Sequence, residues 1–206
     1  MKKLRLAVLI SGTGRSLKNL IGRIKEGSLS AEIAVVVSSN REAKGLQYAE
    51  MGGLKIEIIE KLEYQTLETF SAAVFDVCRE NTVDLVVMAG YVKFLKIPDD
   101  FYGKVLNIHP SLLPAFSGQG FYGDRVHTAV LKKGVKLTGC SVHFVDNDYD
   151  NGPILLQKSC EVRDDDTVGS LNDRVFELEC AAYPEAIQLI AEDRVRIRNH
   201  KVFISR

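Results

Sequence analysis

The stretch LRLAVLISGTGRSLKNLIGRIK, residues 4–25, passes from a short apolar run through two glycines into a segment with helical spacing. The apolar run, Leu4–Ile10, is typical of a strand that is buried on both faces of a parallel sheet. The residues that then share one helical face are Leu17, Leu20, Ile21 and Ile24. A strand, a glycine turn and a helix in this order predict the first unit of an α/β fold.

The same alternation of apolar runs and helical segments continues along the chain. Four further runs are predicted to be strands: residues 33–37, 56–59, 85–89 and 105–108. The segment before residue 85 is helical in its spacing, because Phe70, Val74 and Val77 share a face. This order predicts a mostly parallel, doubly wound, Rossmann-like sheet with helices on both faces.

After residue 136 the rhythm changes. Two strands joined by a turn around residues 148–152 are predicted, followed by a long helix over residues 167–193 that Pro184 should kink. Residues 162–168, VRDDDTV, are expected to form a solvated loop with Asp166 or Thr167 as the N-cap, and residues 194–204 a small hairpin. The class is therefore α/β with an antiparallel addition, and residues 1–206 are expected to form a single domain.

Composition limits the class of partner. The chain has 206 residues, with 27 Lys and Arg balancing 27 Asp and Glu, so no net field favours nucleic acid or a membrane surface. The 4 cysteines lack the CxxC spacing of zinc or redox sites, and no apolar run is long enough to span a bilayer. We expect a cytoplasmic protein that binds small molecules and no metal.

The glycine turn SGTGRS, residues 11–16, is a candidate anion site. Gly12 and Gly14 allow a tight turn, the helix after it presents backbone N–H groups, and Arg15 and Ser16 add donors. A glycine turn without a ligand explains the stretch equally well. NAD is not expected, because Leu17 replaces a third glycine and the next predicted strand ends without an acidic residue.

A second candidate is VLNIHPSLLPAF, residues 105–116. Asn107 and His109 are two apart on a predicted strand, so both side chains project to the same face, and Pro110 ends the strand. Ligands bind at the carboxyl ends of strands in such folds, which favours a site over a pair of buried, hydrogen-bonded residues.

Three other polar residues have ordinary structural interpretations from local sequence. Asp150 lies in DYDNGP, which is normal turn chemistry unless a distant partner such as His109 faces it. His143 is expected to be a hydrogen-bonded structural residue on a strand. His127 is expected on a helix surface or at a helix cap.

Taken together, these stretches resemble the glycinamide ribonucleotide formyltransferase family of purine synthesis, which uses 10-formyltetrahydrofolate. The segments that carry the resemblance are VLISGTGRSL, VVMAGYVKFL, LNIHPSLLPAF, LTGCSVHFVDNDYDNGPILLQ and RVFELECAAYPEAI. The block Asn-x-His-Pro-Ser-Leu-Leu-Pro marks the wider formyltransferase superfamily. The Ser-Gly-x-Gly and Ser-Val-His-Phe-Val blocks narrow the resemblance to the glycinamide ribonucleotide formyltransferase family within it.

The resemblance implies roles for particular residues. The implied catalytic residues are Asn107, His109 and Asp150. The implied substrate-binding residues are Gly14, Arg15 and Ser16 for the phosphate and Glu179 near the glycinamide end. The implied folate-binding residues are Val92, Lys93, Phe94, Leu95 and Asn107. The chain departs from the family at Leu67, where an arginine is frequent, and at Ser117 and Gln119.

Other functions remain open at this point. Methionyl-tRNA formyltransferase and formyltetrahydrofolate hydrolase share the Asn-x-His core, but the first carries an RNA-binding domain and the second a regulatory domain, for which this chain has no room. A catalytically silent nucleotide-binding module is the alternative from another class. A monomer or a homodimer is expected.

Overall fold

The computed structural model describes residues 3–205, which fall into two compact units, residues 3–107 and 108–205. Within the first unit the strands follow the spatial order 56–58, 31–38, 4–10, 85–88 and the start of 105–109.

The first unit is a parallel α/β layer structure. Its strands are β1 (Leu4–Ile10), β2 (Ala31–Ser38), β3 (Ile56–Ile58), β4 (Leu85–Met88) and the start of β5 (Val105–His109). Its helices are α1 (Arg15–Lys25), α2 (Leu46–Met51) and α3 (Leu67–Glu80), with short 3₁₀ turns at Lys61–Glu63 and Asp99–Phe101. The pairings β2–β3, β1–β2, β1–β4 and β4–β5 are all parallel, which confirms the doubly wound prediction.

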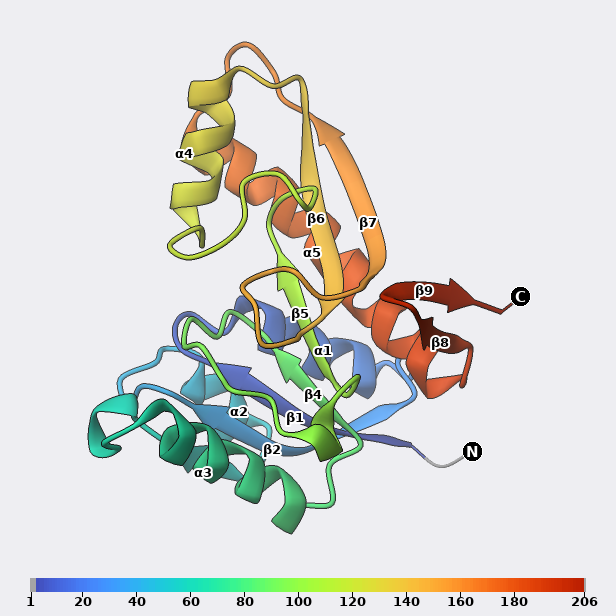
Figure 1. Ribbon diagram of the computed structural model, residues 1–206. Coiled ribbons are helices and arrows are strands. Elements are labelled where there is room, and N and C mark those ends of the chain that lie inside the picture. The colour runs from blue at the N-terminus through green and yellow to red at the C-terminus, as the bar shows by residue number, and fades with distance from the viewer. Residues whose placement is uncertain (1–2, 206) are drawn as a thin grey trace. The chain divides into compact units, whose positions relative to one another are not determined.

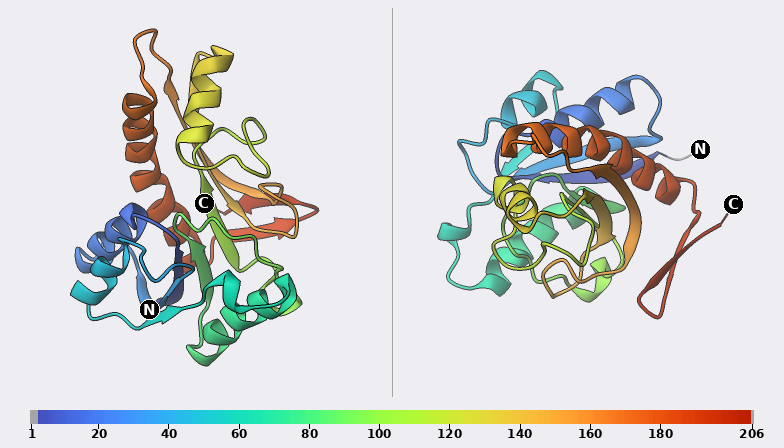
Figure 2. Two further views of the ribbon diagram at one scale, coloured as in Figure 1. Left: turned by 90° about the vertical axis from the view of Figure 1, so that its left-hand side faces the viewer. Right: turned by 90° about the horizontal axis from the view of Figure 1, so that it is seen from above.

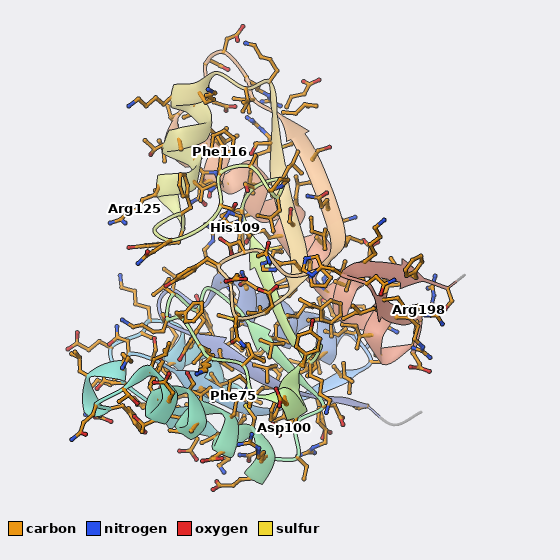
Figure 3. All side chains as sticks on the ribbon, viewed as in Figure 1. Phe75, Asp100, His109, Phe116, Arg125 and Arg198 are labelled. Carbon is orange, nitrogen blue, oxygen red and sulfur yellow. The ribbon has the colours of Figure 1, made fainter. Side chains whose placement is uncertain are left out.

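Helices cover both faces of this layer. Figure 2 shows α1 and α2 on one face of the strands and α3 on the opposite face. The centre of β1 is fully buried, as an apolar strand between two helical layers must be. On the α3 side, Phe75, which is labelled in Figure 3, packs against Phe101 with ring centroids 4.8 Å apart.

The second unit is built on an antiparallel pair. Strands β6 (Leu137–Phe144) and β7 (Ile154–Glu161) pair antiparallel, and α5 (Val168–Ala191) packs along both of them (Figure 1). Helix α4 (Asp124–Lys133) packs on α5. The tail forms the antiparallel hairpin of β8 (Val195–Arg198) and β9 (Lys201–Ile204), so the antiparallel addition, the long helix and the terminal hairpin are confirmed.

Details at the ends of elements differ from the sequence prediction. Strand β2 begins at Ala31, two residues earlier than expected, and α2 was not predicted. Thr167 is the N-cap of α5, and its hydroxyl accepts from the Ser170 N–H. Asp166 is not solvated, because its carboxylate is buried against the Arg174 guanidinium at 2.7 Å. Helix α5 runs through Pro184, and the expected kink stays a prediction.

Candidate active site

The glycine turn lies between the carboxyl end of β1 and α1. Gly14 is the N-cap of α1 with φ 70°, a left-handed conformation that favours glycine. A Cβ on Gly45 would lie only 2.7 Å from the Gly14 Cα, and the Gly45 N–H donates to the Gly12 carbonyl at 2.9 Å. Gly14 is therefore required by the backbone itself, whether or not a ligand binds.

The same turn has the donors that an anion needs. Arg15 is exposed and Ser16 is half-buried, and both stand in the first turn of α1. The first turn of a helix directs backbone N–H groups and the positive end of the dipole toward its ligand. The chemistry of the turn therefore suits a phosphate.

Ser11 connects three strand-end segments of the first unit. Its Oγ lies 2.7 Å from the Ser39 Oγ after β2, and it accepts a hydrogen bond from the Val92 N–H after β4 at 3.1 Å. Val92 opens the segment 92–95, for which the family resemblance implies a role in folate binding. Sequence reasoning missed both Ser11 and Gly45, since only the fold brings their partners to them.

The predicted folate residues differ in exposure. Val92 and Lys93 are exposed and Phe94 is half-buried, whereas Leu95 is 2% exposed and packs into the core. Leu95 therefore supports this segment from beneath.

In the second unit, His109 and Asp150 face each other. His109 ends β5 and is buried, and its Nδ1 lies 3.7 Å from the Asp150 Oδ2. Asp150 adopts φ 51° in the turn after β6, and its Oδ2 accepts from the Gly118 N–H at 3.0 Å. The long-range partner that would turn an ordinary turn residue into a candidate catalytic one is thus present.

The hydrogen bond made by the other ring nitrogen of His109, Nε2, determines which nitrogen carries the hydrogen in the neutral ring. Its Nε2 lies 2.8 Å from the Phe116 carbonyl oxygen, and Figure 3 shows these two residues near each other. Because a carbonyl only accepts, Nε2 carries the hydrogen and a neutral His109 presents its Nδ1 lone pair toward Asp150. A second proton would bind on Nδ1, the side that faces the carboxylate.

His143 lies on the other side of the same carboxylate. Its Nε2 is 3.8 Å from the Asp150 Oδ1, while its Nδ1 donates to the Phe144 carbonyl at 2.9 Å. Burial lowers the pKa of His143 below its ordinary value. The prediction of a hydrogen-bonded strand histidine is confirmed, and Asp150 lies between two imidazoles.

The prediction for His127 was wrong. Its side chain is 2% exposed rather than on the surface of α4 or at its cap, and its Nδ1 has no hydrogen-bond partner among the protein atoms of residues 3–205. It stands three positions before Val130, so helical spacing places it on the apolar face.

Two further residues that the sequence predicts to belong to the site, Asn107 and Glu179, are both half-buried. Asn107 is half-buried on β5, two residues before His109 and in register with Met88. Glu179 is half-buried on α5, and its charge acts on Cys140 of β6, where burial and then Glu179 raise the thiol pKa to about 12.

Within residues 3–205, no group of three or more His, Cys, Asp or Glu could hold a metal ion. Over the same residues, no helix has the length and apolar character that a membrane crossing needs.

Comparison with known proteins identifies the family of this chain. The sequence model of the formyl transferase family matches residues 4–187. The chain therefore belongs to the formyl transferase family.

Particular relatives narrow the comparison. A phosphoribosylglycinamide formyltransferase of Bacillus subtilis is 34% identical, over 91% of this chain and 94% of the relative. A crystal structure of glycinamide ribonucleotide transformylase 1 from Symbiobacterium toebii is 38% identical with a TM-score of 0.94, covering 100% of this chain and 95% of that one. The trifunctional purine biosynthetic protein adenosine-3 of Gallus gallus is 42% identical over 95% of this chain, which spans only 19% of that relative.

Proposed function

We propose that the protein transfers a formyl group from 10-formyltetrahydrofolate to the amine of 5′-phosphoribosylglycinamide, a step of purine synthesis. The observation that carries this proposal is the buried His109 on β5 with Asp150 facing its Nδ1 at 3.7 Å. The likeness to phosphoribosylglycinamide formyltransferases over nearly the whole chain supports the choice of substrates.

Formyl transfer requires stabilisation of an oxyanion. The amine attacks the formyl carbon, and the tetrahedral intermediate carries negative charge on the former carbonyl oxygen. The Asn107 amide can donate to this oxygen, and a protonated His109 adds a charged donor. Because Nε2 is held by the Phe116 carbonyl, Nδ1 is the nitrogen that gains and gives up the proton.

Asp150 supports the charged form of His109. A carboxylate next to an imidazole favours the protonated ring. The 3.7 Å separation exceeds hydrogen-bonding range, so proton exchange between the two groups requires a bridging water or a small closing movement. Asp150 then passes the amine's proton toward the departing folate nitrogen.

The resemblance to the glycinamide ribonucleotide formyltransferase family supplies the binding roles of the remaining candidates. Gly14, Arg15 and Ser16 are proposed to bind the phosphate, and Glu179 to bind near the glycinamide amine. The segment 92–95, with Val92, Lys93, Phe94 and Leu95, and also Asn107 are proposed to bind the folate. A single domain over residues 1–206, a cytoplasmic location and a monomer or homodimer stay predictions.

The direct test is an assay with purified protein, phosphoribosylglycinamide and fresh 10-formyltetrahydrofolate. We expect formylated ribonucleotide to accumulate with a matching amount of tetrahydrofolate. Release of formate in place of the formylated product would instead indicate a hydrolase. The absence of both products would contradict an enzymatic role with this donor.

A further inference from the structure

The loop that follows His109 is fastened to the β6–β7 pair by one buried hydroxyl. The Ser141 side chain on β6 is fully buried. Its Oγ accepts from the Leu113 N–H at 2.9 Å and from the Gln157 Nε2 at 2.7 Å, and it donates to the Ser111 carbonyl at 2.7 Å. One donor and two acceptors exhaust what a hydroxyl offers: two of the Ser141 hydrogen bonds hold this loop, and the third comes from Gln157 on the neighbouring strand.

Gln157 adds a second tie from the neighbouring strand. It is the cross-strand partner of Ser141, and its Nε2 also donates to the Leu113 carbonyl at 3.2 Å. Both polar groups of the Leu113 backbone are thereby bound to the β6–β7 pair. The loop cannot shift without breaking the two buried hydrogen bonds to Ser141 and the partly buried one from Gln157.

The loop in turn positions both proposed catalytic groups of this unit. Ser111 Oγ donates to the Ala115 carbonyl at 2.5 Å, and the next residue, Phe116, has φ 52°. An aromatic residue adopts this left-handed conformation only where its surroundings impose it. In this conformation the Phe116 carbonyl accepts from His109, and two residues later the Gly118 N–H donates to Asp150.

We propose that Ser141 and Gln157 are positioning residues that set the tautomer of His109 through this loop. Their side-chain hydrogen bonds go to Ser111, Leu113 and each other, not to His109 or Asp150. They hold the Phe116 carbonyl where it keeps the hydrogen on Nε2, which leaves Nδ1 free to take up the proton that formyl transfer moves. The catalytic consequence rests on the proposed function, whereas the effect on the tautomer does not.

The test uses Gln157→Leu, which removes both N–H donors at nearly constant size. Gln157→Glu, which keeps the size but replaces the donating amide nitrogen by an oxygen of a charged carboxylate, gives a second variant. Ser159→Leu, two residues along β7 at an exposed position, is the matched control. The readouts are the side-chain ¹⁵N shifts of His109 by NMR, and kcat with both KM values.

In the wild type and in Ser159→Leu, the shifts should report hydrogen on Nε2. In both Gln157 variants we expect them to move toward a mixture of tautomers, with kcat lower by roughly 10- to 100-fold and both KM values little changed. Wild-type His109 shifts in folded Gln157 variants would overturn the proposal even if the wild type formylates nothing. Altered shifts with an unchanged kcat would overturn the catalytic consequence alone.

Discussion

Gly14 and Gly45 make a backbone-to-backbone contact that leaves no room for a side chain on either residue. A Cβ on Gly14 would overlap the Gly45 Cα, and Gly14 also has φ 70°. This contact joins the turn before α1 to the start of α2. A substitution at Gly14 thus tests the architecture of the turn before it tests any ligand.

Gly14→Ala should lower the free energy of unfolding by more than about 1 kcal/mol, because a left-handed conformation and an overlap are both imposed on the new side chain. Gly12→Ala is the matched control in the same turn, since a Cβ there meets nothing within 4 Å. It should change stability by less than about 0.5 kcal/mol. Urea unfolding of both variants measures the difference, and equal losses would refute the contact as the cause.

Ser11→Ala should weaken binding of the formyl donor. The variant removes the acceptor of the Val92 N–H, so the segment 92–95 loses its tie to the turn after β1. One hydrogen bond of this kind is worth about 0.5–1.5 kcal/mol, which corresponds to a rise of about 2- to 10-fold in the KM for the donor. Thr13→Ala, exposed in the same turn, should leave this KM unchanged. A similar rise in both variants would mean that the turn as a whole, and not Ser11, is responsible.

Stability should depend on pH through His127. Burial is the main cause that lowers the pKa of His127, the charge of His109 lowers it further, and Asp124 opposes both. The unfolded chain then binds the proton more readily than the folded protein. Stability therefore falls as pH drops below the ordinary histidine pKa of about 6.5 toward the lower folded value.

His127→Leu should reduce this loss of stability. We expect the difference in unfolding free energy between pH 7.5 and 5.5 to be smaller in the variant than in the wild type. The remainder reflects other groups, including His143, whose pKa burial also lowers. His200→Gln, at an exposed position, is the control and should keep the wild-type dependence. An unchanged dependence in His127→Leu would show that His127 already finds compensation for its burial.

The sequence predicted those features that depend on local pattern. Apolar runs such as residues 6–10 of β1 are buried on both faces, so the parallel strands could be recognised without knowing their partners. Helix α2 was missed because six residues are too few to establish a helical period. His127 was misjudged because its polarity was given more weight than its spacing from Val130.

The remaining features depend on contacts between distant residues. The acceptor of His109 is the Phe116 backbone carbonyl, and no side-chain pattern reveals where a carbonyl points. The hydroxyl of Ser141 and the amide of Gln157 also do not stand out in the sequence, because polar residues are common on strands whose side chains alternate between two faces. Their importance lies in a loop that the fold places against them.

Asp150→Asn separates a turn residue from a proton carrier. Asparagine tolerates the left-handed φ of 51° and can still accept from the Gly118 N–H, so the fold should be retained with a nearly unchanged melting temperature. The charge facing His109 and His143 is lost, which disfavours protonation of His109 and interrupts transfer. We therefore expect kcat to fall by on the order of 10²- to 10⁴-fold.

The matched control is Asp148→Asn, which lies exposed in the same turn and should keep normal turnover. His109→Asn should lose about as much as Asp150→Asn, and the double variant much less than the product of the two single losses, because both residues act on the same proton. Steady-state kinetics with both substrates measures these losses. Near-normal turnover in Asp150→Asn would exclude Asp150 from the mechanism and leave oxyanion stabilisation to Asn107 and His109 alone.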